Sequence, residues 1–369
     1  MENGENDMKI TKLCTTYLRI PVETALVNIT KSRAFMEVIL LKVETDQCIT
    51  GYGYTYTDGF GGRAIQTMLE TDIQELVIGY DPTNIKAVVR RVLWELRQAG
   101  FAGITVLATA ALDFALWDIF SKYTSLPIGK LLGAYRDSIP MYASIAGWIG
   151  LPREEMVARA KELIQEKGLV GIKIQVGRGT ADQDEARIKA LREELGDNVK
   201  LFIDANTILD IPSAVKLGKR LTPYDIFWME EPISIRDLEG HAILSSQIDI
   251  PLASGENFYG IQDSDEYIKR RLVAYLQADV IRVGGITEWI RIAALADAHG
   301  IKMSPHFVME VTVEVQCAIQ NSLFVEYIPW FQSYFKDPVR VENGHIYARQ
   351  SPGLGLEFDE DAIRKYRID

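Results

Sequence analysis

Three acidic residues recur at a fixed spacing in the second half of this 369-residue chain. Asp204, Glu230 and Glu256 lie 26 residues apart each time, and each follows a short apolar run. Carboxylates that crowd together raise one another's pKa unless a cation neutralises them. An all-oxygen ligand set suits a hard divalent ion, and Mg²⁺ accepts two or three carboxylates while keeping positions for water or substrate. The pattern therefore predicts a Mg²⁺ site formed by these three residues.

Residues that can move protons lie in the neighbouring apolar runs. Asp279 and His306 come next along the chain. An Asp that accepts a hydrogen bond from a His orients the ring and raises its basicity, so the pair is expected to act as a general base or acid. Lys173, earlier in the chain, offers a fixed positive charge. Glu326, in the last run, can donate a proton or hydrogen bond if its pKa is raised.

After Gly133, short β-type runs alternate with helical segments, and the residues named above lie at the ends of these runs. Helices are expected at segments such as 154–166, 182–195, 211–221 and 288–298. Eight strands with helices between them favour an α/β fold of the closed (β/α)-barrel type, a modified TIM barrel. The C-terminal strand ends of such a barrel meet at one mouth, which would bring the acidic residues and the dyad together. The expected strands are 139–143, 171–176, 200–204, 226–230, 251–255, 278–283, 301–305 and 323–327.

The first part of the chain has a different organisation. Strand-like runs fill residues 9–56, and helical patterns follow at 63–80, 83–99 and 105–123, which indicates an α+β domain. The first two of these helices are amphipathic and the third is very apolar. Asp113 and Asp118, inside the third, are expected to be interface or capping partners. We divide the chain into an α+β domain at 1–130, a barrel at 131–327 and a C-terminal segment at 328–369 that packs back on the first domain.

Composition excludes several classes of function. The formal charge of −11 repels phosphate backbones, so no nucleic-acid partner is expected. The three cysteines, Cys14, Cys48 and Cys317, are isolated, which fits a reducing compartment and a cytoplasmic protein. The polar start at Met1–Asp7 lacks the apolar centre of a signal peptide. No apolar run approaches the ~20 residues that a membrane span needs, so no membrane partner is expected.

Five sequence motifs resemble the mandelate racemase/muconate lactonizing enzyme-like branch of the enolase superfamily, over nearly the whole chain. They are Phe202-Ile203-Asp204-Ala205-Asn206, Trp228-Met229-Glu230-Glu231-Pro232, Ser254-Gly255-Glu256-Asn257, Asp279 to Thr287, and Ser304-Pro305-His306. The resemblance implies a Mg²⁺-dependent enzyme whose first domain, completed by the C-terminal tail, caps the barrel. It implies that Lys173 and the metal bind a substrate carboxylate, that Glu326 donates to it, and that His306 removes the α-proton. It also implies a homo-oligomer.

One position departs from the family's pattern. The second strand of the family often carries Lys-x-Lys, with the second lysine acting as a base, but this chain has Lys173-Ile174-Gln175. Glutamine cannot accept a proton at neutral pH. Two-base racemisation is then less favoured than β-elimination, in which one imidazole removes the α-proton and then protonates the departing hydroxyl. We therefore predict dehydration of an aldonic or aldaric acid to a 2-keto-3-deoxy acid.

Substrate contacts are predicted at Asn206 and Gln175 in the barrel and at Tyr54 and Arg63 in the cap. Tyr54, Tyr56 or Arg63 is also a candidate second acid, and loops near residues 21–33 and 52–63 are expected to select the substrate. Cycloisomerisation of an anhydro sugar acid, or racemisation or epimerisation of a related acid, remains an alternative because each begins with α-proton removal. A non-catalytic sugar-acid-binding protein and a glycosidase with paired carboxylates are alternatives of other classes.

Overall fold

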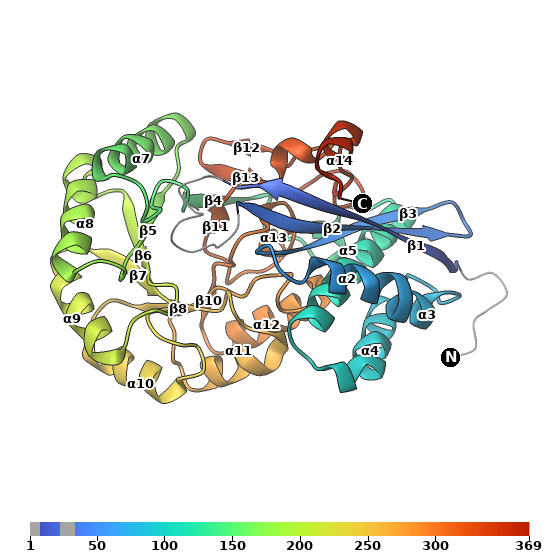
Figure 1. Cartoon of the computed structure of the whole chain (residues 1–369), viewed down its shortest axis with the longest axis horizontal. Helices are drawn as coiled ribbons and strands as arrows, with labels where there is room; N and C mark the ends of the chain where they lie inside the picture. The colour runs from blue at the N-terminus through green and yellow to red at the C-terminus, as the bar shows by residue number, and fades with distance from the viewer. Residues whose placement is uncertain (1–7, 23–33, 369) are drawn as a thin grey trace.

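The computed structural model describes residues 8–22 and 34–368, and Figure 1 shows a sheet-and-helix domain beside a barrel ringed by helices. Most of the predicted substrate-selecting loop at 21–33 and the predicted polar start at Met1–Asp7 lie outside the described residues.

The first domain is built on a three-stranded antiparallel sheet in the order β1 (Ile10–Pro21), β2 (Phe35–Thr45) and β3 (Thr50–Thr57). Strand β3 packs closely on helix α5 (Ile104–Thr124). A Cβ atom at Gly51 or Gly53 would clash with the backbone carbonyl of Ala115 or Ala111 in that helix. Since successive strand residues face opposite sides, glycines allow the helix to approach one face while the alternating tyrosines occupy the other.

The remaining cap elements are helical, near the predicted ranges but interrupted by turns. They are α2 (Gly62–Met68), a π-helical turn (Leu69–Ile73), α3 (Gln74–Val77), α4 (Ile85–Glu95), a 3₁₀ turn (Leu96–Ala99) and α6 (Ile128–Leu131). Helix α5, with 21 residues, is long and apolar enough to cross a membrane by length and composition, so the expectation that no run has this length was wrong. In the structure 83% of its most apolar window is buried inside the protein, as in the core helix of a globular domain.

Eight parallel strands form the barrel in the described part of the chain. Each pairs with the next, β11 pairs with β4, and a parallel bridge between Met303 and Ser322 joins β10 to the segment before β11. The ring is therefore closed, as predicted. The strands are β4 (Ser138–Ala143), β5 (Gly171–Gln175), β6 (Lys200–Asp204), β7 (Ile226–Glu230), β8 (Leu252–Ser254), β9 (Tyr275–Leu276), β10 (Lys302–Met303) and β11 (Val325–Tyr327).

The predicted strand at 278–283 was wrong. Strand β9 ends at Leu276, and a turn at residues 280–284 leads into the next helix. The β-type composition of this run is overridden because Asp279 Oδ1 accepts the backbone N–H groups of Ile281 and Arg282 at 2.7 and 3.1 Å. Such side-chain-to-backbone bonds replace the ladder bonds of a strand.

Helices follow the barrel strands and surround them (Figure 1). Several begin at residues that the sequence marks as caps: Thr180 forms a capping box with Gln183, and Asp210 and Asp237 cap two others. The predicted segments 154–166, 182–195, 211–221 and 288–298 are all helical. The barrel helices are α7 (Arg153–Lys167), α8 (Ala181–Leu195), α9 (Ile211–Leu221), α10 (Leu238–Gln247), α11 (Gly260–Lys269), α12 (Ile286–Ala298) and α13 (Met309–Cys317).

The C-terminal segment contacts both larger parts. It contains a 3₁₀ turn (Gln332–Tyr334), β12 (Val341–Glu342), β13 (His345–Tyr347) and α14 (Glu360–Tyr366). Strand β13 pairs antiparallel with β4, whereas the backbone N–H of Ile368 donates to Tyr17 of β1 at 2.9 Å. Asp118 of α5 accepts the N–H groups of Leu354 and of Tyr52 at 2.6 and 2.9 Å. Asp113 accepts that of Thr287 in α12 at 3.2 Å, so both buried aspartates join elements, as expected.

Candidate active site

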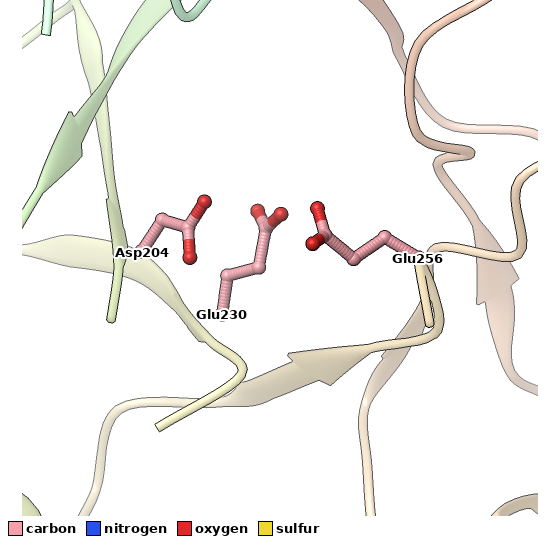
Figure 2. Close-up of side chains that lie close together, drawn as sticks. All are labelled: Asp204, Glu230 and Glu256. Carbon is pink, nitrogen blue, oxygen red and sulfur yellow. The ribbon is translucent and has the colours of Figure 1, made fainter. Parts of the chain in front are cut away.

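The three acidic residues meet at the C-terminal ends of adjacent strands. Asp204 is the Cα partner of Glu230 across the β6–β7 pair. Glu256 follows β8 after Gly255, whose φ of 144° and close approach to the backbone nitrogens of Gln277 and Ala278 exclude a side chain. One carboxylate oxygen from each of the three lies within 4.8 Å of the others, and Figure 2 shows the three carboxylates side by side.

The environment of this cluster favours a bound cation. Burial, together with the negative charge of Glu256, raises the pKa of Asp204 to about 6 against the opposing effect of Lys173. Burial also raises the pKa of Glu230, and the charge of Asp204 adds to that effect. Holding all three carboxylates ionised therefore requires more positive charge than Lys173 provides. The oxygen-only donor set and its spacing fit a hard divalent ion such as Mg²⁺.

Lys173 lies in the barrel between the cluster and Glu326. Its Nζ is 2.7 Å from Glu230, 2.8 Å from Glu326 and 3.4 Å from Asp204. Burial opposes the charge on Lys173, but these carboxylates outweigh it and raise its pKa well above the usual value. Lys173 is therefore a fixed cation, as predicted from the sequence.

Glu326 differs from its predicted state. Burial favours its neutral form, but the charge of Lys173 lowers the pKa of Glu326 to about 2. The carboxylate accepts hydrogen bonds from the Ser144 hydroxyl and from the backbone N–H of Phe307, the latter at 3.0 Å. The expected donation by Glu326 needed a raised pKa, and the neighbouring ammonium shifts the pKa in the opposite direction.

His306 and Asp279 form the predicted pair. His306 Nδ1 lies 2.8 Å from Asp279 Oδ2, and Nε2 lies 3.4 Å from Glu256 Oε2, so the second ring nitrogen faces the acidic cluster. The hydrogen bond and charge of His306 lower the pKa of Asp279 despite its burial. An ionised Asp279 only accepts, which places the Nδ1 proton on the histidine. Burial lowers the pKa of His306, but the charges of Glu256 and Asp279 outweigh it and raise the pKa to about 9.

A cap residue completes the surroundings of Asp279. The hydroxyl of Tyr56 in β3 donates to Asp279 Oδ2 at 2.7 Å, the same oxygen that His306 contacts. Together with the two backbone N–H groups on Oδ1, this bond fills the acceptor positions of the carboxylate. Sequence reasoning named Tyr56 only as a possible acid. Its position beside Asp279 arises from the docking of the cap, for which the sequence contains no signal.

The opposite side of the site carries two amides. Gln175 Nε2 donates to Asn206 Oδ1 at 3.0 Å, and Asn206 Nδ2 donates to Asp204 Oδ2 at 3.1 Å. Gln175 Oε1 accepts the backbone N–H of Ile149 at 3.2 Å. The structure thus brings Gln175 and Asn206 into one chain of hydrogen bonds that ends at the acidic cluster.

A cavity of about 240 Å³ opens above these groups. Of the residues predicted from the sequence, Glu230 and Asp279 are fully buried and are not among the lining residues. The predicted residues that line it are Lys173, Gln175, Asp204, Asn206, Glu256, His306 and Glu326. Tyr56, Trp148, Arg178, Arg282 and Trp330 also line it and were not assigned as ligand contacts from the sequence. The volume is below the usual ~300–1,000 Å³ of drug-sized sites, which suits a small acid.

The structure does not bring Tyr54 and Arg63 to this cavity. Tyr54 is fully buried, its hydroxyl bonded to Glu310 and its ring packed edge-to-face on Phe331 at 5.8 Å between centroids. Arg63 lies over the Tyr17 ring at 4.5 Å and donates to Gln66 at 3.0 Å. Both predicted substrate contacts are therefore corrected. Tyr54 belongs to the cap–barrel junction and Arg63 to the outside of the cap.

Comparison with known proteins agrees with this geometry. Residues 8–133 match the mandelate racemase / muconate lactonizing enzyme N-terminal domain, and residues 155–362 match the enolase C-terminal domain-like family. The chain is 32% identical over 349 residues to an L-talarate/galactarate dehydratase of Salmonella typhimurium, covering 94% of this chain and 87% of that protein. It is 30% identical over 361 residues to a 3,6-anhydro-alpha-L-galactonate cycloisomerase of Streptomyces coelicolor, covering 97% and 99%.

Among solved structures, L-talarate dehydratase from Polaromonas sp. JS666, complexed with Mg and L-glucarate, superimposes with a TM-score of 0.90 at 32% identity, covering 98% of each chain. A racemase from Streptomyces coelicolor with bound magnesium gives 0.92 at 30% identity, covering 97% of this chain and all of that one. The closed barrel, the acidic cluster and these matches over both domains lead to one assignment. The chain belongs to the enolase superfamily, in its mandelate racemase/muconate lactonizing enzyme branch.

Proposed function

We propose that this protein removes the proton α to the carboxylate of a sugar acid with the help of Mg²⁺ and dehydrates an aldonate or aldarate to a 2-keto-3-deoxy acid. The observation that carries the proposal is the asymmetry of the site. His306 Nε2 faces the acidic cluster from one side. Among the described residues, the other side offers the amides of Gln175 and Asn206 and the charged side chains of Lys173 and Arg178.

Asp204, Glu230 and Glu256 would hold the metal, since their oxygens converge and their buried charges need a cation. Bound there, Mg²⁺ would supply the positive charge that stabilises the negative charge developing on the substrate carboxylate when the α-proton leaves. Lys173 contributes a second, permanent positive charge beside the same position. Glu326 keeps Lys173 in place by accepting from its ammonium at 2.8 Å.

One imidazole is sufficient for the proton transfers that the dehydration requires. Against the lowering effect of burial, the charge of Glu256 contributes most to the raised pKa of His306, and a cation held by Glu256 would offset that charge and free Nε2 of its proton. His306 Nε2 then takes the proton from C2, while Asp279 holds Nδ1–H and stabilises the resulting imidazolium. The imidazolium then returns this proton to the hydroxyl on C3, the C3–O bond breaks, and water leaves. The remaining enol becomes the 2-keto-3-deoxy acid by tautomerisation. No second base is needed, which fits glutamine at position 175.

A direct test is a screen of the purified protein with Mg²⁺ against a panel of aldonic and aldaric acids, with detection of 2-keto acids. NMR in deuterated water records exchange of the α-proton in parallel. We expect keto-acid formation that disappears in His306→Asn. Exchange that persists in His306→Asn, or turnover that is insensitive to a chelator, would contradict the proposal.

A second candidate is cycloisomerisation of an anhydro sugar acid. The relative from Streptomyces coelicolor that covers nearly the whole chain favours it, and it too begins with removal of an α-proton. Ring opening without loss of water in the same screen would support this candidate over dehydration. A sugar-acid-binding protein without catalysis would show Mg²⁺-dependent binding but no α-proton exchange.

A further inference from the structure

One cation of the cavity is used neither by the chemistry above nor to hold another part of the site. Within the described residues, three side chains with a permanent positive charge line it: Lys173, Arg178 and Arg282. Lys173 is held by three carboxylates. Arg282 donates to the backbone oxygen of Glu256 at 2.9 Å and to Asn257 Oδ1 at 2.7 Å, so its guanidinium helps to hold the Glu256 turn.

Arg178 is different because it is exposed and makes no hydrogen bond or ion pair with the residues that the structure describes. Charged side chains at the surface are common, but this one borders the cavity that contains the reactive groups. Its guanidinium is free to bind an anion that enters, and a planar guanidinium suits the two oxygens of a carboxylate.

The backbone that carries Arg178 is anchored on both sides. Gly177, with φ of 90°, turns the chain after β5, and its N–H donates to Asp184 Oδ2 of α8 at 2.9 Å. Thr180 starts α8 through a capping box with Gln183. Arg178 therefore extends from a short loop fixed at both ends to the barrel.

Residues on β5 and the loop after it run from the deep end of the cavity to its rim. Lys173 lies deep beside the acidic cluster, Gln175 follows at the strand end, and Arg178 comes after the turn at the exposed rim. A ligand whose reacting carboxylate lies near Lys173 and the metal ligands would extend along Gln175 and Asn206 towards Arg178.

We infer that Arg178 binds a second carboxylate at the distal end of the substrate, so that the preferred substrates are sugar diacids, the aldarates. This inference rests on the proposed sugar-acid function and narrows its substrate class. An aldonate presents a neutral hydroxymethyl group at the same end, which gains no charge-assisted hydrogen bond from a guanidinium.

The test compares galactarate with D-galactonate, which share their stereocentres and differ only in whether C6 is a carboxylate or a hydroxymethyl group. Calorimetry measures both dissociation constants with Mg²⁺ in the His306→Asn protein, so that turnover does not interfere. We expect galactarate to bind about tenfold more tightly, the effect of one charge-assisted contact. Adding Arg178→Gln should bring the ratio of the two constants close to one.

Arg153→Gln is the matched control, because it removes another exposed arginine, from α7, that does not line the cavity. It should keep the preference for galactarate. Equal binding of the two acids with Arg178 present, an unchanged ratio in Arg178→Gln, or binding of neither acid would overturn the inference. If the preference depends on Arg178 but no sugar acid is dehydrated, the diacid site stands and the proposed dehydration fails.

Discussion

The two walls of the cavity differ in what their polar groups can do. On the wall formed after β9 and β10, His306 Nε2 is directed at the acidic cluster, and Asp279 behind it accepts hydrogen bonds from the histidine, Tyr56 and two backbone N–H groups. On the wall formed by β5 and β6, Gln175 and Asn206 bond to each other and to Asp204. The first wall can exchange protons, and the second can only orient a ligand.

Lys173 does not change this asymmetry, although it lies on the second wall. Three carboxylates within 3.4 Å raise its pKa well above the usual value, so it keeps its proton. A neutral lysine, which a base would need to be, is not available in this setting. Among the described residues, glutamine in place of a second lysine leaves the proposed proton abstraction to the wall that carries His306.

Metal removal should have the largest effect, because in the proposed mechanism both walls act on a substrate whose carboxylate is bound by the metal. We expect a chelator to reduce turnover below detection and Mg²⁺ to restore it. Mg²⁺ should also raise the thermal unfolding midpoint, since it binds only the folded protein. In Glu256→Gln the Mg²⁺ concentration for half of this rise should increase roughly tenfold or more. If the unfolding midpoint of the wild-type protein does not respond to Mg²⁺, the predicted metal site is wrong.

Substitution of the base should distinguish the walls most directly. We expect His306→Asn to lower kcat on the order of 10³-fold and to abolish exchange of the α-proton, because general acid–base catalysis is lost. Gln175→Leu, on the opposite wall, should mainly raise KM, since it removes hydrogen bonds and no proton transfer. Comparable losses of kcat in the two variants would show that the two walls do not differ in their roles.

Tyr56→Phe tests whether the cap supports the reactive wall. The change leaves Asp279 without one hydrogen bond, so we expect kcat to fall about tenfold, with α-proton exchange falling in parallel and KM nearly unchanged. Tyr54→Phe is the matched control: it removes the same hydroxyl two residues earlier in β3, from a bond to Glu310. It should lower the unfolding midpoint without the loss of kcat. Equal kinetic losses in both variants would indicate a general effect on cap packing.

Gln175→Lys should change the rate of dehydration least, but it should change which products form. A lysine there would supply a second proton acceptor opposite His306. We expect dehydration to fall roughly two- to fivefold, through lost bonds to Asn206 and Ile149. Slow formation of the C2 epimer should appear beside the keto acid. Chiral chromatography of the remaining substrate would detect it, and an unchanged stereochemistry would show that position 175 does not reach the opposite face.

Much of the fold followed from local pattern. Apolar runs that end in Asp204, Glu230 and His306 predicted both strands and their common mouth, because strand ends of a closed barrel converge. The run at 278–283 is an exception, because hydrogen bonds from the backbone to the side chain of Asp279 override its β-type composition. Glu326 shows a second limit, since its low pKa depends on the ammonium of Lys173, which lies 153 residues earlier in the sequence.

The sequence by itself determined which residue types end each barrel strand, and hence the acidic cluster, the histidine–aspartate pair and the missing second base. Periodicity and strand order encode these features locally. Only the tertiary structure decided which of two similar tyrosines in β3 reaches Asp279, since Tyr54 and Tyr56 have the same alternation and differ only in what the docked barrel places opposite them. It also decided that Arg178 lines the cavity while Arg63 packs against the cap. Contacts between distant segments depend on how two domains pack, and no local pattern records that packing.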